Sequence, residues 1–111
     1  MNYNGKKFRA IKNSENGETS SETVFQYFQK GNIIEADYSG GKIVKGHLLG
    51  IVDNEGNIKM NYHQINTGGK IMTGKCDSKP EVLTNGKIRL HERWEWTSGD
   101  LSTGQSIIEE I

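Results

Sequence analysis

Short stretches in which apolar and polar residues alternate recur along the chain, and glycine-rich turns separate them. Alternation with a period of two is typical of a β-strand that buries one face. No stretch repeats the apolar spacing of a helix, and the frequent glycines would interrupt a long one. The pattern predicts eight strands, over Phe8–Ile11, Val24–Phe28, Ile33–Tyr38, Ile43–Val52, Ile58–Ile65, Ile71–Cys76, Ile88–Thr97 and Ser106–Ile111.

Glycine-containing groups mark seven turns between these strands. Glycine and asparagine tolerate the positive φ that two-residue hairpin turns require. Two longer connections, Asp77–Asn85 with the only proline and Gly99–Gln105, are expected to form loops at the rim of the sheet. The turn groups are Asn16-Gly17, Gly31-Asn32, Gly40-Gly41, Glu55-Gly56-Asn57, Gly68-Gly69, Asn85-Gly86 and Ser98-Gly99-Asp100.

Eight short strands joined in sequence by tight turns form an antiparallel up-and-down meander. At eight strands a meander can close into a small barrel, whose interior is filled by side chains or holds one small ligand. An open sandwich is the rival fold, but it needs longer crossovers than most of these turns provide. We therefore expect an all-β chain folded as one barrel domain over residues 1–111.

Composition and charge narrow the classes of partner. The 111 residues carry 14 Lys and Arg against 14 Asp and Glu, so the chain lacks the basic excess of a nucleic-acid binder. The single cysteine, Cys76, cannot form an internal disulfide. The longest apolar run, Leu48–Val52, is far too short to span a bilayer. These features predict a cytoplasmic protein with no nucleic-acid and no membrane partner.

The strand over Ile88–Thr97 carries the most unusual residue. Its even positions are apolar except for Glu92, so alternation places this carboxylate on the core face. A buried carboxylate needs hydrogen-bond partners or a raised pKa. Either a neighbouring strand's Tyr, Gln or Arg satisfies it, or it sits near a wet barrel mouth, or it points into a ligand cavity.

Aromatic and polar side chains share the inward faces of several predicted strands. Aromatic walls with a few polar tips are typical of a small-molecule pocket. The alternative is that Trp94 and Trp96 simply fill the barrel. The candidate ligand-binding residues are Tyr38, Tyr62, Gln64, Glu92, Trp94 and Trp96.

Some strands are apolar on both faces, although a barrel has only one inside. In the fourth strand one face carries Ile43, Leu49 and Ile51 together with His47. The opposite face, on which glycines would relieve crowding in a coiled strand, carries Val44, Gly46, Leu48, Gly50 and Val52. Gly74, in the sixth strand, is expected to relieve crowding in the same way. A second subunit that covers the outer apolar residues would explain the pattern, so a homo-oligomer is expected.

The sequence carries no convincing catalytic or cofactor motif. Gly69–Cys76 approaches a phosphate-binding loop, but it lies in a strand-like stretch, no helix follows, and Cys76 replaces the required hydroxyl. The three histidines are not at ligand spacing within one strand, and alternation puts all of them outside. Cys76 is expected to be a buried, inert thiol. We therefore expect no catalytic residues, no metal and no cofactor.

Four segments carry a resemblance, covering nearly the whole chain, to a family of small bacterial proteins. They are Gly46–Asp53, Met60–Asn66, Ile88–Asp100 and Ser106–Ile111. The resemblance implies an avidin-like, calycin-like barrel with a ligand site at its mouth and oligomerisation. Members of the family are often labelled N-acetylglutamate synthase, yet no Gln or Arg here has the glycine spacing of an acetyl-CoA loop.

The leading functional hypothesis is a non-enzymatic barrel that binds a small, partly apolar molecule through the six candidate residues. A structural or protein-interaction barrel with a filled core is the alternative, and the acetyltransferase of the family label is a third. The state of the interior separates the first two, because an open, polar-tipped cavity and a packed core lead to different functions.

Overall fold

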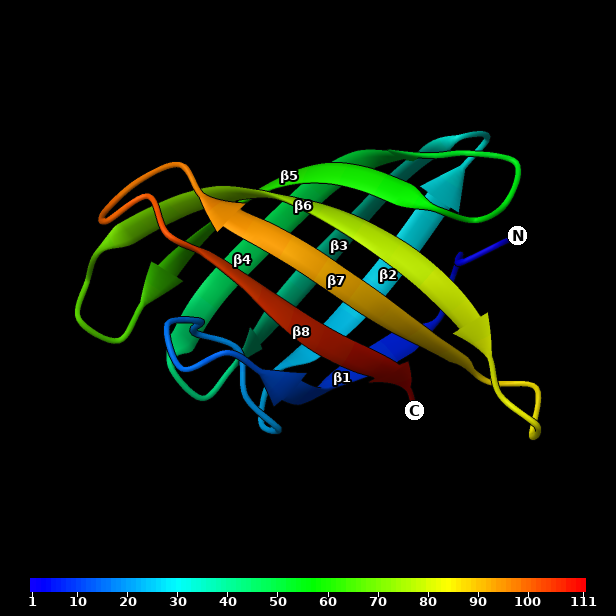
Figure 1. Ribbon diagram of the computed structural model, residues 1–111, viewed down its shortest axis with the longest axis horizontal. Coiled ribbons are helices and arrows are strands. Elements are labelled where there is room, and N and C mark those ends of the chain that lie inside the picture. The colour runs from blue at the N-terminus through cyan, green and yellow to red at the C-terminus, as the bar shows by residue number, and fades with distance from the viewer.

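The computed structural model describes residues 1–111 and consists of eight antiparallel strands. Figure 1 shows them wrapped into one barrel. The structure contains no helix of the length and hydropathy that a membrane crossing would require. The strands are β1 (Lys7–Asn13), β2 (Val24–Lys30), β3 (Ile33–Gly40), β4 (Ile43–Val52), β5 (Ile58–Asn66), β6 (Ile71–Val82), β7 (Ile88–Trp96) and β8 (Thr103–Glu110).

Every strand pairs with its neighbours in sequence, and the barrel closes where β1 meets β8. The closing ladder brings Phe8 opposite Glu110 and Asn13 opposite Ser106, with a register shift between Ala10 and Lys12. The strand order β1 to β8 around a closed barrel confirms the predicted meander and leaves no open sandwich. Closure matters because it gives the sheet one inside, on which the alternating rows converge.

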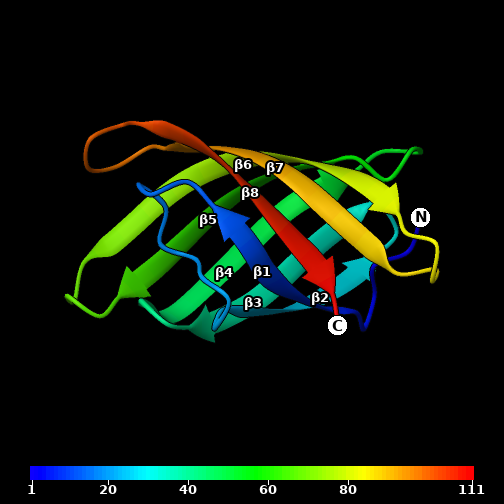
Figure 2. The ribbon, with the colours of Figure 1, turned by 60° about the horizontal axis from the view of Figure 1, so that its bottom comes forward.

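The barrel has two distinct ends. The turns β2–β3, β4–β5 and β6–β7 lie at the end that also holds both termini (Figure 1). The β3–β4, β5–β6 and β7–β8 turns lie at the other end, together with the segment between β1 and β2 (Figure 2). Glycines with positive φ occupy all six turns, among them Gly31 and Gly86, which is the conformation that turn glycines were expected to supply.

The segment between β1 and β2 differs from the prediction. Asn16-Gly17 was expected to form a tight hairpin turn, but the structure has no strand between Asn13 and Val24. We call residues 14–23 the β1–β2 loop. Its length follows from composition, because residues 12–23 contain no apolar side chain that could continue an alternating strand.

The predicted rim loop at Asp77–Asn85 is largely wrong, because β6 continues to Val82. Pro80 pairs with Leu90 of β7, whereas the pairing of β6 with β5 ends at Ser78. Proline lacks a backbone N–H donor, so it is tolerated where a strand has a partner on only one side. The second predicted rim loop is shorter than expected, since Thr103 already belongs to β8.

The first two residues of β4 face the opposite way from the prediction, which placed Val44 inside and Ile43 outside. Gly46, Leu48 and Val52 face inward as expected, but Val44 is exposed and its neighbour Ile43 is buried. A register shift between Ile43 and Lys45 against β5 is the reason, because one extra residue inverts the faces beyond it. Simple alternation does not foresee such a bulge.

Aromatic residues close the end of the barrel that holds the termini. Tyr3, Phe8 and Tyr27 are fully buried, and the rings of Phe8 and Tyr27 meet edge to face with centroids 5.0 Å apart. The Tyr3 hydroxyl donates to the Gly56 carbonyl in the β4–β5 turn. Residues before β1 therefore seal this end with an apolar side chain.

Candidate functional site

A cavity of about 50 Å³ lies inside the barrel toward the end that carries the β1–β2 loop. Its wall combines side chains from all eight strands with residues of the loop. The interior is thus neither spacious nor fully packed. The lining residues that carry the argument below are Glu18, Tyr38, Tyr62, Gln64, Glu92 and Trp94.

Three aromatic rings of the wall occupy space that glycines on neighbouring strands leave open. A Cβ atom added to any of these glycines would collide with the ring opposite. The absence of a side chain therefore lets each ring lie against the backbone of the next strand, which is how aromatic residues support glycines in sheets. The pairs are Tyr38 with Gly46, Tyr62 with Gly74 and Trp94 with Gly104.

A series of hydrogen-bonded polar side chains runs from β3 through β5 to the loop. The Tyr38 hydroxyl donates to Oε1 of Gln64 at 2.8 Å. Nε2 of Gln64 donates to Oε1 of Glu18 at 2.8 Å, and Nδ2 of Asn66 donates to Oε2 of the same carboxylate at 2.8 Å. The carboxylate of Glu18 thus sits between two amides at the mouth of the barrel.

The indole N–H groups of both tryptophans donate to the end of β1 or to the loop that follows it. Nε1 of Trp94 donates to Oδ1 of Asn13 at 3.1 Å, and Nε1 of Trp96 donates to the carbonyl of Asn16 at 3.0 Å. The Trp96 ring meets Tyr62 edge to face with centroids 5.8 Å apart. The last residue of β1 and a loop carbonyl therefore accept the indole hydrogen bonds of the aromatic wall.

Glu92 lies deeper, on the row that crosses β6, β7 and β8. Its two carboxylate oxygens accept from the hydroxyls of Ser78 at 2.8 Å and Ser106 at 3.0 Å. Burial raises its pKa from 4.5 to about 7, and the two serine hydrogen bonds oppose this shift. The partners are serines rather than the Tyr, Gln or Arg expected from a neighbouring strand.

No basic side chain lines the cavity. The other titratable groups near Glu92 are neutral phenols and a thiol, and burial raises the pKa of Tyr27, Tyr38, Tyr62 and Cys76 alike. The hydroxyl of Tyr27 is buried without a hydrogen-bond partner. A carboxylate without a cation in such surroundings can take a proton or accept hydrogen bonds from a guest molecule.

The structure brings all six sequence-predicted site residues to this one cavity. Sequence reasoning missed Glu18, because alternation within strands says nothing about a loop that folds across a barrel end, and it missed Asn13 and Asn66, which end β1 and β5. The available signal was the long polar run before β2. The structure shows no group of three or more His, Cys, Asp or Glu side chains that could hold a metal ion.

The histidines lie on the outer wall. His63 and His91 are exposed and His47 is half-exposed, with the rings of His47 and His63 on adjacent strands 5.7 Å apart between centroids. Cys76 is buried as a free thiol on an inward row, where an inert thiol was expected. None of the three histidines touches the cavity.

Comparisons with known proteins give one family. The model of a family described as avidin-like protein matches residues 1–111. A search of curated proteins and a search of solved structures found no match.

Proposed function

Because this chain belongs to the avidin-like family, we propose that its barrel binds a small molecule without transforming it, in the cavity beneath the β1–β2 loop. The ligand contacts would come from Tyr38, Tyr62, Gln64, Glu92, Trp94 and Trp96. An avidin-like barrel fits small-molecule binding in general. The identity of the guest has to follow from the chemistry of the wall.

The observation that carries the proposal is Glu92, a buried carboxylate that lines the cavity and has no cationic partner. Each of its oxygens accepts one serine hydrogen bond, so lone pairs remain for a donor on the ligand. Around it the wall is aromatic, from Tyr62 and Trp94 in particular. The favoured ligand has an N–H or O–H donor at its inner end and an apolar body.

Size adds a condition on how the ligand enters. Pockets for drug-sized molecules span roughly 300–1,000 Å³, several times the present cavity of about 50 Å³. A drug-sized ligand would need more volume than the cavity offers. The β1–β2 loop now occupies the space next to the cavity that could supply it. Binding should therefore displace loop side chains from the mouth rather than fill a ready-made void.

Intrinsic fluorescence offers a direct test, because the chain has only two tryptophans and both line the cavity. The protein would be titrated with a metabolite library, and changes in Trp emission would be followed. Compounds with a donor at the end of an apolar body should shift the emission. If no compound class produces a saturable response, the proposal is wrong.

Glu92→Gln supplies the matched variant for any compound that binds. It keeps the size of the side chain but removes the negative charge, so affinity for a donor-bearing compound should fall by roughly tenfold. Glu15→Gln, which makes the same change on the exposed part of the loop, should leave affinity unchanged. Equal losses in both variants would mean that Glu92 does not contact the ligand.

We further propose that a second copy of the chain covers the outer apolar residues of β3 and β4. Ile33 is 55% exposed, and its partner across the ladder, Ile51, is 60% exposed. Leu49, on the same face of β4, is 52% exposed. Adjacent exposed apolar side chains of this kind favour burial in an interface.

Light scattering would test the oligomer. Wild-type protein should have at least twice the mass of the chain, and Ile51→Asp should reduce it toward a monomer. Val82→Asp, at a comparably exposed site on β6, is the control and should leave the mass unchanged. A wild-type protein that is monomeric at all concentrations would refute the proposal.

A further inference from the structure

We propose that the side-chain amides of Gln64 and Asn66 form a carboxylate-binding subsite, which Glu18 fills until an acidic ligand displaces it. The inference rests on the proposed function, and it names the ligand as a small organic acid with an apolar body. The chain's own loop would then act as the competitor for the site.

The first support is the fixed orientation of the Gln64 amide. Only 4% of Gln64 is exposed, and its Oε1 accepts from the buried hydroxyl of Tyr38. A phenol has a single proton to donate, and the amide oxygen is the only acceptor that Gln64 offers. The hydrogen bond therefore directs Nε2 toward the mouth, so this donor is in place whether or not Glu18 occupies it.

Asn66 is oriented by the opposite arrangement, through its backbone turn. Its Oδ1 accepts from the backbone N–H groups of Gly68 at 3.0 Å and Lys70 at 3.1 Å in the β5–β6 turn. With the amide oxygen held by the turn, Nδ2 is left to point at Glu18. Two independent constraints thus aim two N–H donors at one position, which is the geometry that the two oxygens of a carboxylate require.

Glu18 occupies this position without a cation. Each of its oxygens accepts one amide hydrogen bond, and it forms no salt bridge. The residue is half-buried and lies on a loop with no regular structure. A carboxylate held only by neutral donors on a loop can be exchanged for the carboxylate of a ligand, because the same two hydrogen bonds re-form.

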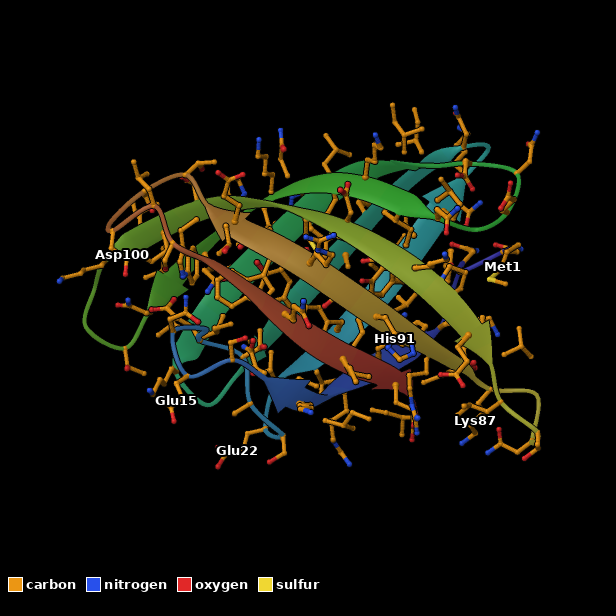
Figure 3. The ribbon with its side chains drawn as sticks, in the orientation of Figure 1. Met1, Glu15, Glu22, Lys87, His91 and Asp100 are labelled. Carbon is orange, nitrogen blue, oxygen red and sulfur yellow. The ribbon has the colours of Figure 1, made fainter.

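The neighbouring acidic residues of the loop do not share this role. Glu15 and Glu22 are exposed, and Figure 3 shows both at the periphery of the molecule, away from the barrel interior. Neither side chain forms a hydrogen bond with the barrel wall, whereas Glu18 reaches across to β5. The contrast provides a matched control on the same loop.

The test removes the Glu18 carboxylate from the subsite and compares the binding of a carboxylate probe with that of an uncharged probe. ¹⁵N NMR would follow the side-chain NH₂ signals of Gln64 and Asn66 while hexanoate, or its uncharged isostere hexanamide, is added to Glu18→Ala. Hexanoate should shift both signals and bind roughly tenfold more tightly than hexanamide, because a carboxylate is the stronger acceptor. Wild-type protein and Glu15→Ala should bind hexanoate roughly tenfold more weakly than Glu18→Ala does.

Glu18→Gln is the control for the empty space that the shorter alanine side chain leaves in Glu18→Ala. It keeps the length of the side chain but offers one acceptor oxygen in place of two, so its affinity for hexanoate should lie between those of wild type and Glu18→Ala. If Glu18→Gln and Glu18→Ala bind hexanoate no better than Glu15→Ala, Glu18 is not a competitor and the inference is wrong.

The outcomes separate this inference from the proposed function. Equal binding of hexanoate and hexanamide to Glu18→Ala would refute the carboxylate subsite, while the interior would still bind small molecules. No binding of either probe would also refute the subsite, and the fluorescence screen of the wild-type protein would then decide the proposed function by itself.

Discussion

Both ends of the barrel are covered by a chain segment, but by opposite chemistry. At the end that holds the termini, residues before β1 insert the ring of Tyr3, which is 0% exposed and packs near Phe8 and Tyr27. At the other end the β1–β2 loop covers the mouth with polar contacts, such as that of Glu18 with Gln64. The first closure is mainly aromatic packing, with one hydrogen bond from the Tyr3 hydroxyl, and the second is made of hydrogen bonds.

This contrast indicates which end of the barrel opens at the lower cost. Removing a buried aromatic ring from its core loses both transfer free energy and packing, so the Tyr3 closure is expensive to undo. The hydrogen bonds of the loop residues Glu18 and Asn16 can be exchanged for hydrogen bonds to water or to a ligand, at a small net cost. The loop end is therefore the end that opens at the lower cost, and it is where the proposed ligand would enter.

The largest effect should come from truncating the apolar closure. Tyr3→Ala should lower the free energy of unfolding by about 3–5 kcal/mol, because it leaves a cavity among buried rings. Tyr62→Ala, at the half-buried loop end, should cost clearly less. Urea denaturation measures both, and equal losses would erase the proposed contrast between the two ends.

A pH effect should follow from Glu92. Since its pKa is raised to about 7 by burial, the folded state holds this proton more tightly than the unfolded state does. The contribution of Glu92 to stability should therefore be largest at or below about pH 4.5, decline as the pH rises to about 7, and stay low above that. The full decline amounts to about 3 kcal/mol, at about 1.4 kcal/mol for each pKa unit.

Glu92→Gln should remove this decline, because the variant has no proton to lose. Urea unfolding between about pH 4.5 and 8 would measure it, with Glu15→Gln as the exposed control. A wild-type profile that rises over this range, or one that both variants share, would contradict the expected direction.

A smaller effect should come from the glycines beneath the aromatic wall. Gly74→Ala should destabilise the barrel by about 1–3 kcal/mol, because the added Cβ would collide with the ring of Tyr62. In the background of Tyr62→Leu the same change should cost less, since the flat ring no longer fills the space. Strict additivity of the two changes would show that the ring and the glycine are not coupled.

The smallest effect should appear in the undisturbed protein. Backbone amides of Glu18 and Thr19 in the loop should exchange with solvent hydrogen faster than those of Gly5 and Lys6. The latter two donate to the carbonyls of Tyr27 and Tyr3, and they flank the buried closure. Exchange resolved by NMR would measure this, and equal protection would mean that both ends are equally rigid.

Much of the wall could be predicted from sequence, because alternation within a strand depends only on neighbouring residues. In β7 it placed Glu92, Trp94 and Trp96 on the inward row, and in β5 it did the same for Gln64. The glycine turns supplied the number of strands and hence the closed barrel.

What could not be predicted depends on contacts between distant segments. Glu18 meets Gln64 across 46 positions of the sequence, and no local pattern reports such a pair. The exposure of Val44 depends on a bulge against β5, and the length of β6 beyond Cys76 depends on its partner β7. The loop predicted around Pro80 was wrong for the same reason. Whether a proline lies in a loop or in a strand depends on which strands pair with it, and sequence alone does not show that.

That single proline has a consequence for association between molecules. Beyond Ser78, β6 runs past the end of β5 and pairs only with β7, so its other edge could offer backbone donors to a strand from another molecule. Pro80 has no N–H group, which removes a donor from the middle of this overhang. The barrel thereby gains protection against strand addition and fibril-like growth where β6 extends beyond β5.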